Sequence, residues 1–204
     1  YLKVEEFAAL DIGSGPGDLL RELRKLFSQS SICGVDPSVH NVEEAKTFND
    51  IELVHGFWEG QVSGNYDLVS IFGSLMLHPD LKDSLRMAVE KLSQSGIIIF
   101  DYKNPYSAPR QFVRSVMPFI PDSGAKSKLY DQAFHGLPVG FNLPNVEMLL
   151  KSLGLTVLEV NGLRGRNIEI GKNIGLPMPF ANAVDRLMRG RSWIEVIARR
   201  DFSG

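Results

Sequence analysis

Glycines and a carboxylate near the N-terminus have the types and the spacing of a ligand-binding loop. Gly13, Gly15 and Gly17 closely follow the apolar run 7–11, and Asp36 ends the next apolar run, 19 residues beyond Gly17. Glycines at a strand-to-helix turn let the backbone approach a ligand closely and expose amide N–H groups at the start of the helix. An acidic side chain at the end of the second strand can accept hydrogen bonds from both hydroxyls of a ribose. The pattern therefore predicts a nucleoside-containing ligand.

The residue at position 18 indicates which kind of nucleoside fits. Dinucleotide-binding folds use the pattern Gly-x-Gly-x-x-Gly, and the place of its third glycine is taken here by Asp18. An acidic side chain at the start of a helix puts a negative charge where a pyrophosphate would bind. A ligand with a positive centre and no phosphate is therefore favoured over a nicotinamide dinucleotide. A structural alternative stays open, in which the glycines only make a tight turn and Asp36 caps the next helix.

The elements that must position this loop follow from the hydrophobic pattern. Apolar runs bounded by glycine, proline and polar residues predict seven strands, at residues 7–11, 31–36, 51–55, 66–72, 96–101, 155–160 and 193–198. Apolar residues at helical spacing predict helices at residues 19–27, 81–92, 146–153 and 180–188, and the capping-box spacing of Asn41 to Glu44 predicts that another helix opens there. Unbroken apolar strands that alternate with helices are typical of a parallel sheet covered on both faces. The predicted fold class is α/β, with a doubly wound, mostly parallel sheet.

Residues 102–143 interrupt this alternation after the fifth strand. They hold seven of the chain's 19 Phe, Tyr and Trp residues, among several prolines and glycines and without clear periodicity. A long segment of this kind is usually functional or disordered, and the aromatic content argues against disorder. We interpret it as a lid or pocket wall with a helix around Arg110 to Met117. The predicted organisation is a single domain over 1–204, with a cofactor-binding half at 1–101, the lid at 102–143 and the completion of the sheet at 144–204.

The composition is that of an ordinary globular protein and excludes several classes. The chain has 204 residues, 44% of them hydrophobic and 23% charged, which excludes collagen-like, disordered and disulfide-scaffold proteins. Cys33 is the single cysteine, so an internal disulfide and a multi-cysteine metal site are excluded and a cytoplasmic location is expected. No apolar run reaches the roughly 20 residues of a membrane span, and no targeting segment is visible. The sequence begins with Tyr1 instead of Met, as a trimmed or excised piece would.

Charge is divided unevenly between the two halves of the chain. Residues 1–101 carry 8 Lys and Arg against 16 Asp and Glu, a net charge of −8, whereas residues 102–204 carry 14 against 8, a net charge of +6. An acidic half suits a cationic ligand, and a basic, aromatic half suits an acceptor with a carboxylate or phosphate. Scattered surface charge is the alternative. Nucleic acid is disfavoured as a partner, because the pI is about 6.1 and no RNA-binding module is visible.

Several motifs occur together in a familiar order. They are Asp11-x-Gly-x-Gly-x-Gly17, Gly34-Val-Asp-Pro-Ser38, Tyr66-Asp-Leu-Val-Ser70, Leu75-Met-Leu-His78 and Lys91-Leu-Ser-Gln-Ser-Gly-Ile-Ile-Ile-Phe100. In this order and spacing the chain resembles class I S-adenosylmethionine-dependent methyltransferases, most of all the small-molecule enzymes of the quinone-biosynthesis type. The resemblance runs from about Phe7 to Asp101 and resumes from Val146 to Val160. It implies a Rossmann-like sheet of seven strands with the last strand antiparallel, and a lid inserted after the fifth strand.

The resemblance also implies a cofactor and the residues that bind it. The cofactor would be S-adenosylmethionine, with S-adenosylhomocysteine as its product, and no metal is expected. The methionine part would be surrounded by Asp11, Gly13, Ser14, Gly15 and Gly17, and the ribose would be held by Asp36. The adenine would be bordered by Pro37, Ser38, Phe57 and Trp58, with Glu59 as a further polar contact. The sulfonium would face Phe72 and Gly73.

Methyl transfer needs an aligned acceptor and, for an oxygen or carbon nucleophile, the removal of a proton. The candidate general bases are His78, after the fourth strand, and His135, in the aromatic segment, although each can instead be structural. Contacts with the acceptor are expected from Tyr102, Tyr106, Arg110 and Arg114. We expect transfer to an oxygen of a small anionic or amphipathic metabolite. Two alternatives stay open: a non-catalytic S-adenosylmethionine-binding module, and a methyltransferase that acts on a macromolecule.

Overall fold

The computed structural model describes eight stretches of the chain: residues 6–47, 51–57, 62–78, 80–104, 108–124, 126–128, 143–163 and 193–201. Contacts between residues divide the chain into two compact units. The first unit comprises Tyr1–Asp101, Val146–Val160 and Val196–Gly204, and the second comprises Tyr102–Asn145 and Asn161–Glu195. The predicted cofactor-binding half therefore lies in the first unit. The helix predicted at 180–188 lies outside the described residues.

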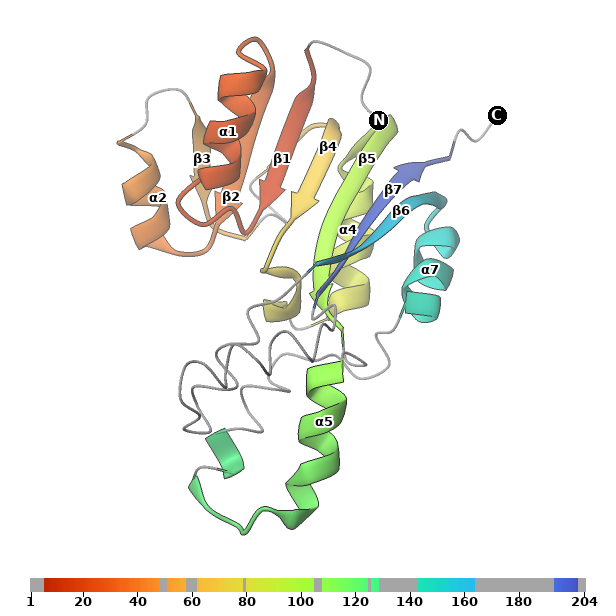
Figure 1. Ribbon diagram of the computed structural model, residues 1–204. Coiled ribbons are helices and arrows are strands. Elements are labelled where there is room, and N and C mark those ends of the chain that lie inside the picture. The colour runs from red at the N-terminus through yellow and green to blue at the C-terminus, as the bar shows by residue number, and fades with distance from the viewer. Residues whose placement is uncertain are drawn as a thin grey trace. The chain divides into compact units, whose positions relative to one another are not determined.

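A seven-stranded sheet forms the framework (Figure 1). Its strands are β1 (Ala8–Ile12), β2 (Ser31–Asp36), β3 (Glu52–His55), β4 (Tyr66–Ile71), β5 (Leu92–Lys103), β6 (Leu155–Leu163) and β7 (Trp193–Arg200). They lie in the order β3-β2-β1-β4-β5-β7-β6. Strands β1 to β5 pair in parallel, and the last strand is antiparallel. The predicted doubly wound, mostly parallel sheet of seven strands is confirmed.

Strand β5 is longer at both ends than the prediction of 96–101. Leu92, which the hydrophobic pattern assigned to the preceding helix, is buried and pairs with Tyr66 of β4. Tyr102 and Lys103, which were assigned to the insertion, belong to the same strand. The side chain of Tyr102 is fully buried, so packing extends the strand beyond the point at which the apolar run ends in sequence.

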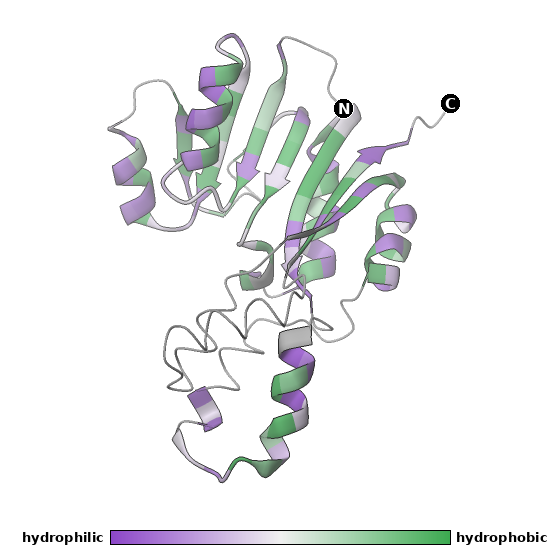
Figure 2. Ribbon diagram, viewed as in Figure 1, coloured by the Kyte–Doolittle hydropathy of each residue, from purple (hydrophilic) through white to green (hydrophobic). Residues whose placement is uncertain are grey.

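Burial on both faces explains why the strands read as continuous apolar runs. Leu10 of β1, Val69 of β4 and Ile98 of β5 have no exposed surface. One core cluster joins β1, β2 and β4 to the helix that follows the glycine loop, through Phe7, Ala9, Leu20, Ile32 and Leu68. Figure 2 shows the same strands as a band of hydrophobic residues. The glycine loop therefore leaves a rigid, buried strand.

Helices cover both faces of the sheet. Figure 1 shows α1 (Asp18–Leu26) and α4 (Leu81–Glu90) on opposite faces. Other described helices are α2 (Val39–Ala45), α5 (Ala108–Val116), α7 (Leu143–Ser152) and the short 3-10 helices η1 (Leu75–Leu77) and η2 (Met117–Phe119). Helix α5 confirms the helix predicted around Arg110 to Met117. In the described part of the chain, no helix is both long and apolar enough to cross a membrane.

Helix α2 begins earlier than the predicted capping box. Its N-cap is Ser38, whose hydroxyl accepts a hydrogen bond from the backbone N–H of Asn41 at 3.3 Å. The prediction of a capping box from Asn41 to Glu44 was wrong, because Asn41 already lies inside the helix. Its side-chain amide instead donates to Asp36 at 2.9 Å. The start of α2 is thus tied to the carboxylate at the end of β2.

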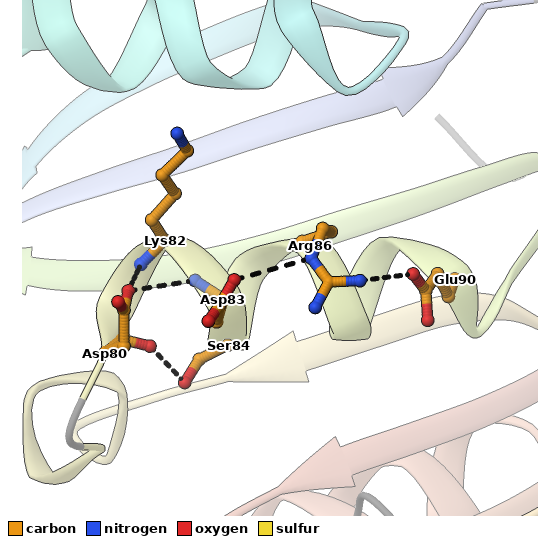
Figure 3. Close-up of polar contacts among 6 residues, drawn as sticks. All are labelled: Asp80, Lys82, Asp83, Ser84, Arg86 and Glu90. Carbon is orange, nitrogen blue, oxygen red and sulfur yellow. Dashed lines mark hydrogen bonds and ion pairs between the residues drawn. The ribbon is translucent and has the colours of Figure 1, made fainter.

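The start of α4 is fixed by its N-cap, Asp80 (Figure 3). The carboxylate of Asp80 accepts hydrogen bonds from the backbone N–H groups of Lys82 and Asp83 at 2.8 and 3.0 Å. The hydroxyl of Ser84 donates to the carbonyl oxygen of Asp80 at 2.7 Å. The two bonds to the carboxylate satisfy N–H groups that a helix leaves without an internal partner. The cap stands two residues after His78, so it fixes the point at which the chain leaves the η1 turn.

Candidate functional site

The glycine loop makes a tight turn that only glycine accommodates at its first position. Gly13, Gly15 and Gly17 all have positive φ, at 70°, 57° and 86°. The N–H of Gly13 donates to the carbonyl of Val35 in β2 at 2.8 Å, so the loop folds back against the neighbouring strand. A Cβ atom at position 13 would collide with the side chain of Ser74. The loop therefore combines a left-handed backbone with a close approach between segments.

The carboxylate of Asp36 organises the loop from the end of β2. Its Oδ2 accepts a hydrogen bond from the N–H of Gly15 at 2.8 Å. Its Oδ1 accepts from the N–H of Ser38 and from the side-chain amide of Asn41, both at 2.9 Å. An ionised carboxylate offers about four acceptor positions, so three internal donors leave about one position for a ligand. Asp36 therefore holds the loop in shape and keeps some capacity to bind.

A cavity of about 670 Å³ lies at the carboxyl ends of β1, β2 and β4. It is lined by Ile12, Gly13, Gly15, Val35, Asp36, Pro37, Ser38, Asn41, Gly56, Phe57, Phe72, Gly73, Ser74, Leu77 and His78. Strand β1 lies between β2 and β4, so the chain crosses over in opposite directions on the two sides of this point. Ligands of open α/β sheets bind at such a switch point. The cavity is therefore the candidate site.

Two acidic side chains lie at or near the site: Asp36 lines the cavity, and Asp11 belongs to the neighbouring strand. Asp11 is buried in β1, where its Oδ1 accepts a hydrogen bond from the hydroxyl of Ser70 at 2.7 Å. Burial raises the pKa of Asp11 to about 7, the hydrogen bond from Ser70 opposes that rise, and the charge of Asp36 adds to it. The described lining of the cavity contains no Lys or Arg. The negative charge of the lining therefore comes from Asp36, since Asp11 with a pKa of about 7 is only partly ionised at neutral pH. A lining with one carboxylate and no described cation favours a ligand with positive charge and disfavours a phosphate.

Most of the residues predicted to bind a cofactor come together in this cavity. Those that line it are Gly13, Gly15, Asp36, Pro37, Ser38, Phe57, Phe72 and Gly73. Asp11, Ser14 and Gly17 do not line it. The hydroxyl of Ser14 is buried beside Gly34, where it has no hydrogen-bond partner among the described residues. Trp58 and Glu59 lie outside the described residues.

Other lining residues were missed from the sequence. They are Ile12, Val35, Asn41, Gly56, Ser74 and Leu77. Asn41 could have been found, because an amide five residues after a strand-end carboxylate can reach back to it from the first turn of the next helix. Ser74 had no sequence signal: its importance depends on the collision that it would make with a side chain at position 13.

The residues predicted to act on the acceptor fall in different parts of the chain. His78 lines the cavity, whereas His135 and Tyr106 lie outside the described residues. In the second unit Arg110 is buried, and its guanidinium donates to the carbonyl of Asn104 at 2.9 Å. Burial lowers the pKa of Arg110. Tyr102, in the same unit, is buried, and Arg114 is exposed.

Lys103 and Arg110 place two cations within electrostatic reach of each other in the second unit. Burial lowers the pKa of Lys103, and the charge of Arg110 lowers it further. Each like charge in a partly dry environment disfavours the charged form of the other. No group of three or more His, Cys, Asp or Glu side chains in the described ranges could hold a metal ion.

Comparison with known families decides the class of this site. A family model described as a methyltransferase domain matches residues 7–160. The chain belongs to the methyltransferase-domain family. The predicted resemblance to S-adenosylmethionine-dependent methyltransferases is confirmed, and with it the class of enzyme and the cofactor. No curated protein matches this methyltransferase by sequence.

Solved structures share the fold of this methyltransferase at low sequence identity. The plantazolicin methyltransferase BpumL, in complex with a triazolic desmethylPZN analog and SAH, is 17% identical with a TM-score of 0.63, over 95% of this chain and 76% of that one. An S-adenosylmethionine-dependent methyltransferase from Mesorhizobium loti is 18% identical with a TM-score of 0.64, over 98% and 94%. A third structure is of the complex between the Trm112 methyltransferase activator of Haloferax volcanii and a methyltransferase. It is 14% identical with a TM-score of 0.68, over 97% of this chain and 84% of that one.

Proposed function

We propose that this methyltransferase binds S-adenosylmethionine in the cavity of the first unit and transfers the methyl group to an oxygen of a small-molecule acceptor. The observation that carries the proposal is the position of the cavity, at the switch point of a methyltransferase sheet, with the carboxylate of Asp36 and no described Lys or Arg in its lining. A sulfonium is a permanent cation, so an electronegative cavity attracts it. The same electrostatics disfavour a dinucleotide, in agreement with the argument from Asp18.

The glycine loop and Asp36 hold the methionine and ribose parts of the cofactor in this proposal. Gly13 and Gly15 line the cavity without side chains, so the loop backbone can approach the ligand closely. Asp36 binds one ribose hydroxyl with the acceptor capacity that Gly15, Ser38 and Asn41 leave to it. The internal donors leave capacity for about one such bond, where the sequence predicted two.

The adenine lies in the apolar part of the cavity that follows β2 and β3 in this proposal. Pro37, Gly56 and Phe57 line this part. Phe57 exposes 61% of its surface, which is unusual for a large apolar side chain beside a cavity. An aromatic base stacked on Phe57 would remove that surface from water. Trp58 is proposed to contribute to the same wall, on the argument from sequence.

The chain's contribution to the chemistry is alignment, the exclusion of water and the removal of one proton. When bound, S-adenosylmethionine supplies an electrophilic methyl group. Phe72 and Gly73 form the wall that faces the sulfonium in this proposal, and His78 lines the same cavity. His78 accepts the proton of the acceptor hydroxyl at an imidazole nitrogen, which leaves the oxygen with the electron pair that it needs as a nucleophile. His135 stays an alternative base.

An anionic acceptor is favoured by the second unit considered by itself. Arg110 is buried there, and Lys103 lies within electrostatic reach of it. Buried guanidinium groups bind carboxylate or phosphate with paired hydrogen bonds. We therefore propose that the acceptor carries such a group, with Tyr102, Tyr106 and Arg114 as further contacts.

The test combines cofactor binding with a transfer assay. Calorimetry measures the Kd of S-adenosylmethionine and S-adenosylhomocysteine, and cofactor with a labelled methyl group is then incubated with small hydroxylated carboxylic acids and phosphates. His78→Gln is expected to lower kcat by about 10²-fold or more with little change in the Kd of the cofactor. His40→Gln is the matched control, because His40 is exposed and does not line the cavity.

The outcomes separate the alternatives. No binding of either cofactor form overturns the cofactor site. Binding without transfer to any acceptor indicates a non-catalytic module. Transfer of label to protein or RNA in place of small molecules indicates a macromolecular acceptor. Unchanged transfer by the His78→Gln variant removes His78 from the mechanism.

A further inference from the structure

The turn between β4 and η1 is anchored to the strands on both sides of it. Its residues Phe72, Gly73 and Ser74 line the cavity. On one side, the hydroxyl of Ser74 donates to the carbonyl of Ile12 in β1 at 2.8 Å. On the other side, the N–H of Gly73 donates to Oδ1 of Asp101 in β5 at 2.7 Å. The turn that faces the ligand is therefore held between the two neighbours of β4 in the sheet.

Gly73 has a backbone conformation that needs such an anchor. Its φ is +67°, in the left-handed region, and a Cβ built on it would meet no atom within 4 Å. No other residue occupies the space into which a Cβ would point, so the hydrogen bond to Asp101 helps to fix the backbone here. Strands β4 and β5 run in parallel register with Ile71 opposite Phe100. The register of the sheet therefore places Asp101, the next residue of β5, beside the start of the turn.

The carboxylate of Asp101 lies directly next to this wall, although Asp101 is not itself one of the described lining residues. Its Oδ1 lies 2.7 Å from a backbone nitrogen of a lining residue. A fixed negative charge attracts a cationic ligand and has little effect on a neutral ligand of the same shape. The methyl donor and its product form such a pair, because the sulfonium loses its positive charge when the methyl group leaves.

We propose that Asp101 is a positioning and specificity residue for the methyl donor, an inference that rests on the proposed function. Its hydrogen bond fixes the Phe72–Gly73 turn against the ligand. Its charge makes the cavity prefer the cationic methyl donor over the neutral product. The neutral product is then released more readily than the cationic donor. The same residue therefore favours both the binding of S-adenosylmethionine and the release of S-adenosylhomocysteine.

The test uses two variants that separate charge from hydrogen bonding. Asp101→Asn keeps an oxygen that can accept the N–H of Gly73 but removes the charge, whereas Asp101→Ala removes both. Ser74→Ala is the matched control, because it loses the other anchor of the same turn and leaves every charge in place. Calorimetry measures the Kd of S-adenosylmethionine, S-adenosylhomocysteine and sinefungin, an analogue with an amine in place of the sulfonium.

For Asp101→Asn we expect the Kd of S-adenosylmethionine and of sinefungin to rise about tenfold, with that of S-adenosylhomocysteine changed less than about twofold. For Ser74→Ala all three Kd values are expected to change by the same factor. For Asp101→Ala we expect, in addition, a lower kcat, because the turn loses its anchor. Equal changes for the three ligands in Asp101→Asn, or no change, would overturn the role of Asp101. A wild-type protein that bound neither cofactor form would overturn the proposed function as well.

Discussion

The side chain of Ser74 occupies the space beside Gly13 that a Cβ at position 13 would need, while its hydroxyl donates to the carbonyl of Ile12 at 2.8 Å. One serine of the β4–η1 turn therefore determines both the identity of the first loop glycine and the position of the loop that follows β1. The loop after β1 and the β4–η1 turn therefore depend on each other, because the side chain of Ser74 fills the space that Gly13 leaves by having no side chain. This relationship gives the first prediction.

Gly13→Ala is expected to destabilise the fold by more than about 2 kcal/mol and to abolish cofactor binding. The cost of a left-handed alanine alone is about 1–2 kcal/mol, and the collision with Ser74 adds to it. Gly15→Ala is the matched control: its φ is also positive, at 57°, but its Cβ would meet no atom within 4 Å. Gly15→Ala is therefore expected to lower the free energy of unfolding only by the roughly 1–2 kcal/mol that a left-handed alanine costs. Urea unfolding curves of the two variants measure the difference.

A second variant tests whether the collision is the cause. Ser74→Gly removes the atoms that a Cβ at position 13 would meet, so the double variant Gly13→Ala/Ser74→Gly is expected to be more stable than the sum of the single changes predicts. Strict additivity of the two unfolding free energies would show that the loss in Gly13→Ala comes from the backbone alone.

Asp36→Ala is expected to weaken binding of both cofactor forms equally, by roughly 1–3 kcal/mol, because the ribose is common to them. The sharper readout uses adenosine and 2′,3′-dideoxyadenosine. The wild-type protein is expected to prefer adenosine, and Asp36→Ala is expected to lose that preference. Calorimetry or ligand competition measures both affinities.

The control for Asp36 is Asn41→Ala, which removes one of its three internal donors and leaves the carboxylate. It is expected to weaken binding by only a few fold while the preference for adenosine is retained. If the preference persisted in Asp36→Ala, the residue would hold the loop without touching the ribose, which is the structural alternative that the sequence left open.

The order of elements could be predicted because it depends on local pattern. Continuous apolar runs gave the strands, and the glycine spacing with Asp36 located the switch point, since both are properties of short segments. The ends of β5 were misplaced for the opposite reason: Leu92 and Tyr102 are strand residues because of what they pack against, and burial is decided by distant segments.

The cavity shows the same division between local and distant determinants. Gly13, Gly15 and Asp36 were found from spacing along the chain. Asn41 and Ser74 were missed because their roles depend on atoms 5 and 61 residues away, Asp36 in one case and Gly13 in the other. Ser14 was predicted to surround the methionine part, but a side chain in a tight turn can face either way, and this one packs beside Gly34.

Asp80→Ala is expected to lower the free energy of unfolding by about 1 kcal/mol, because α4 loses its N-cap. Cofactor affinity is expected to stay within about twofold, since Asp80 does not line the cavity. Glu90→Ala, at the other end of α4, is the control: its ion pair with Arg86 is exposed and contributes little (Figure 3). Thermal and urea unfolding measure whether Asp80→Ala loses more stability than Glu90→Ala. A larger loss of stability in Glu90→Ala would contradict the role of the cap.

Asp11 is expected to make stability fall as the pH rises from about 4 to about 7. Burial raises its pKa from 3.8 to about 7 in the folded protein, so in this range the folded state binds a proton that the unfolded state has released, and ∂ΔG/∂pH is negative. A shift of about three pKa units corresponds to roughly 4 kcal/mol of stability, which is present below pH 4 and lost above pH 7.

Asp11→Asn tests this pH dependence, because it cannot titrate and keeps an oxygen for the Ser70 hydroxyl. Its stability relative to the wild-type protein is therefore expected to increase by about that amount between pH 4 and 8, measured by urea unfolding at each pH. Parallel profiles for the two proteins would mean that Asp11 is already ionised in the folded state, and that its negative charge is a permanent part of the site.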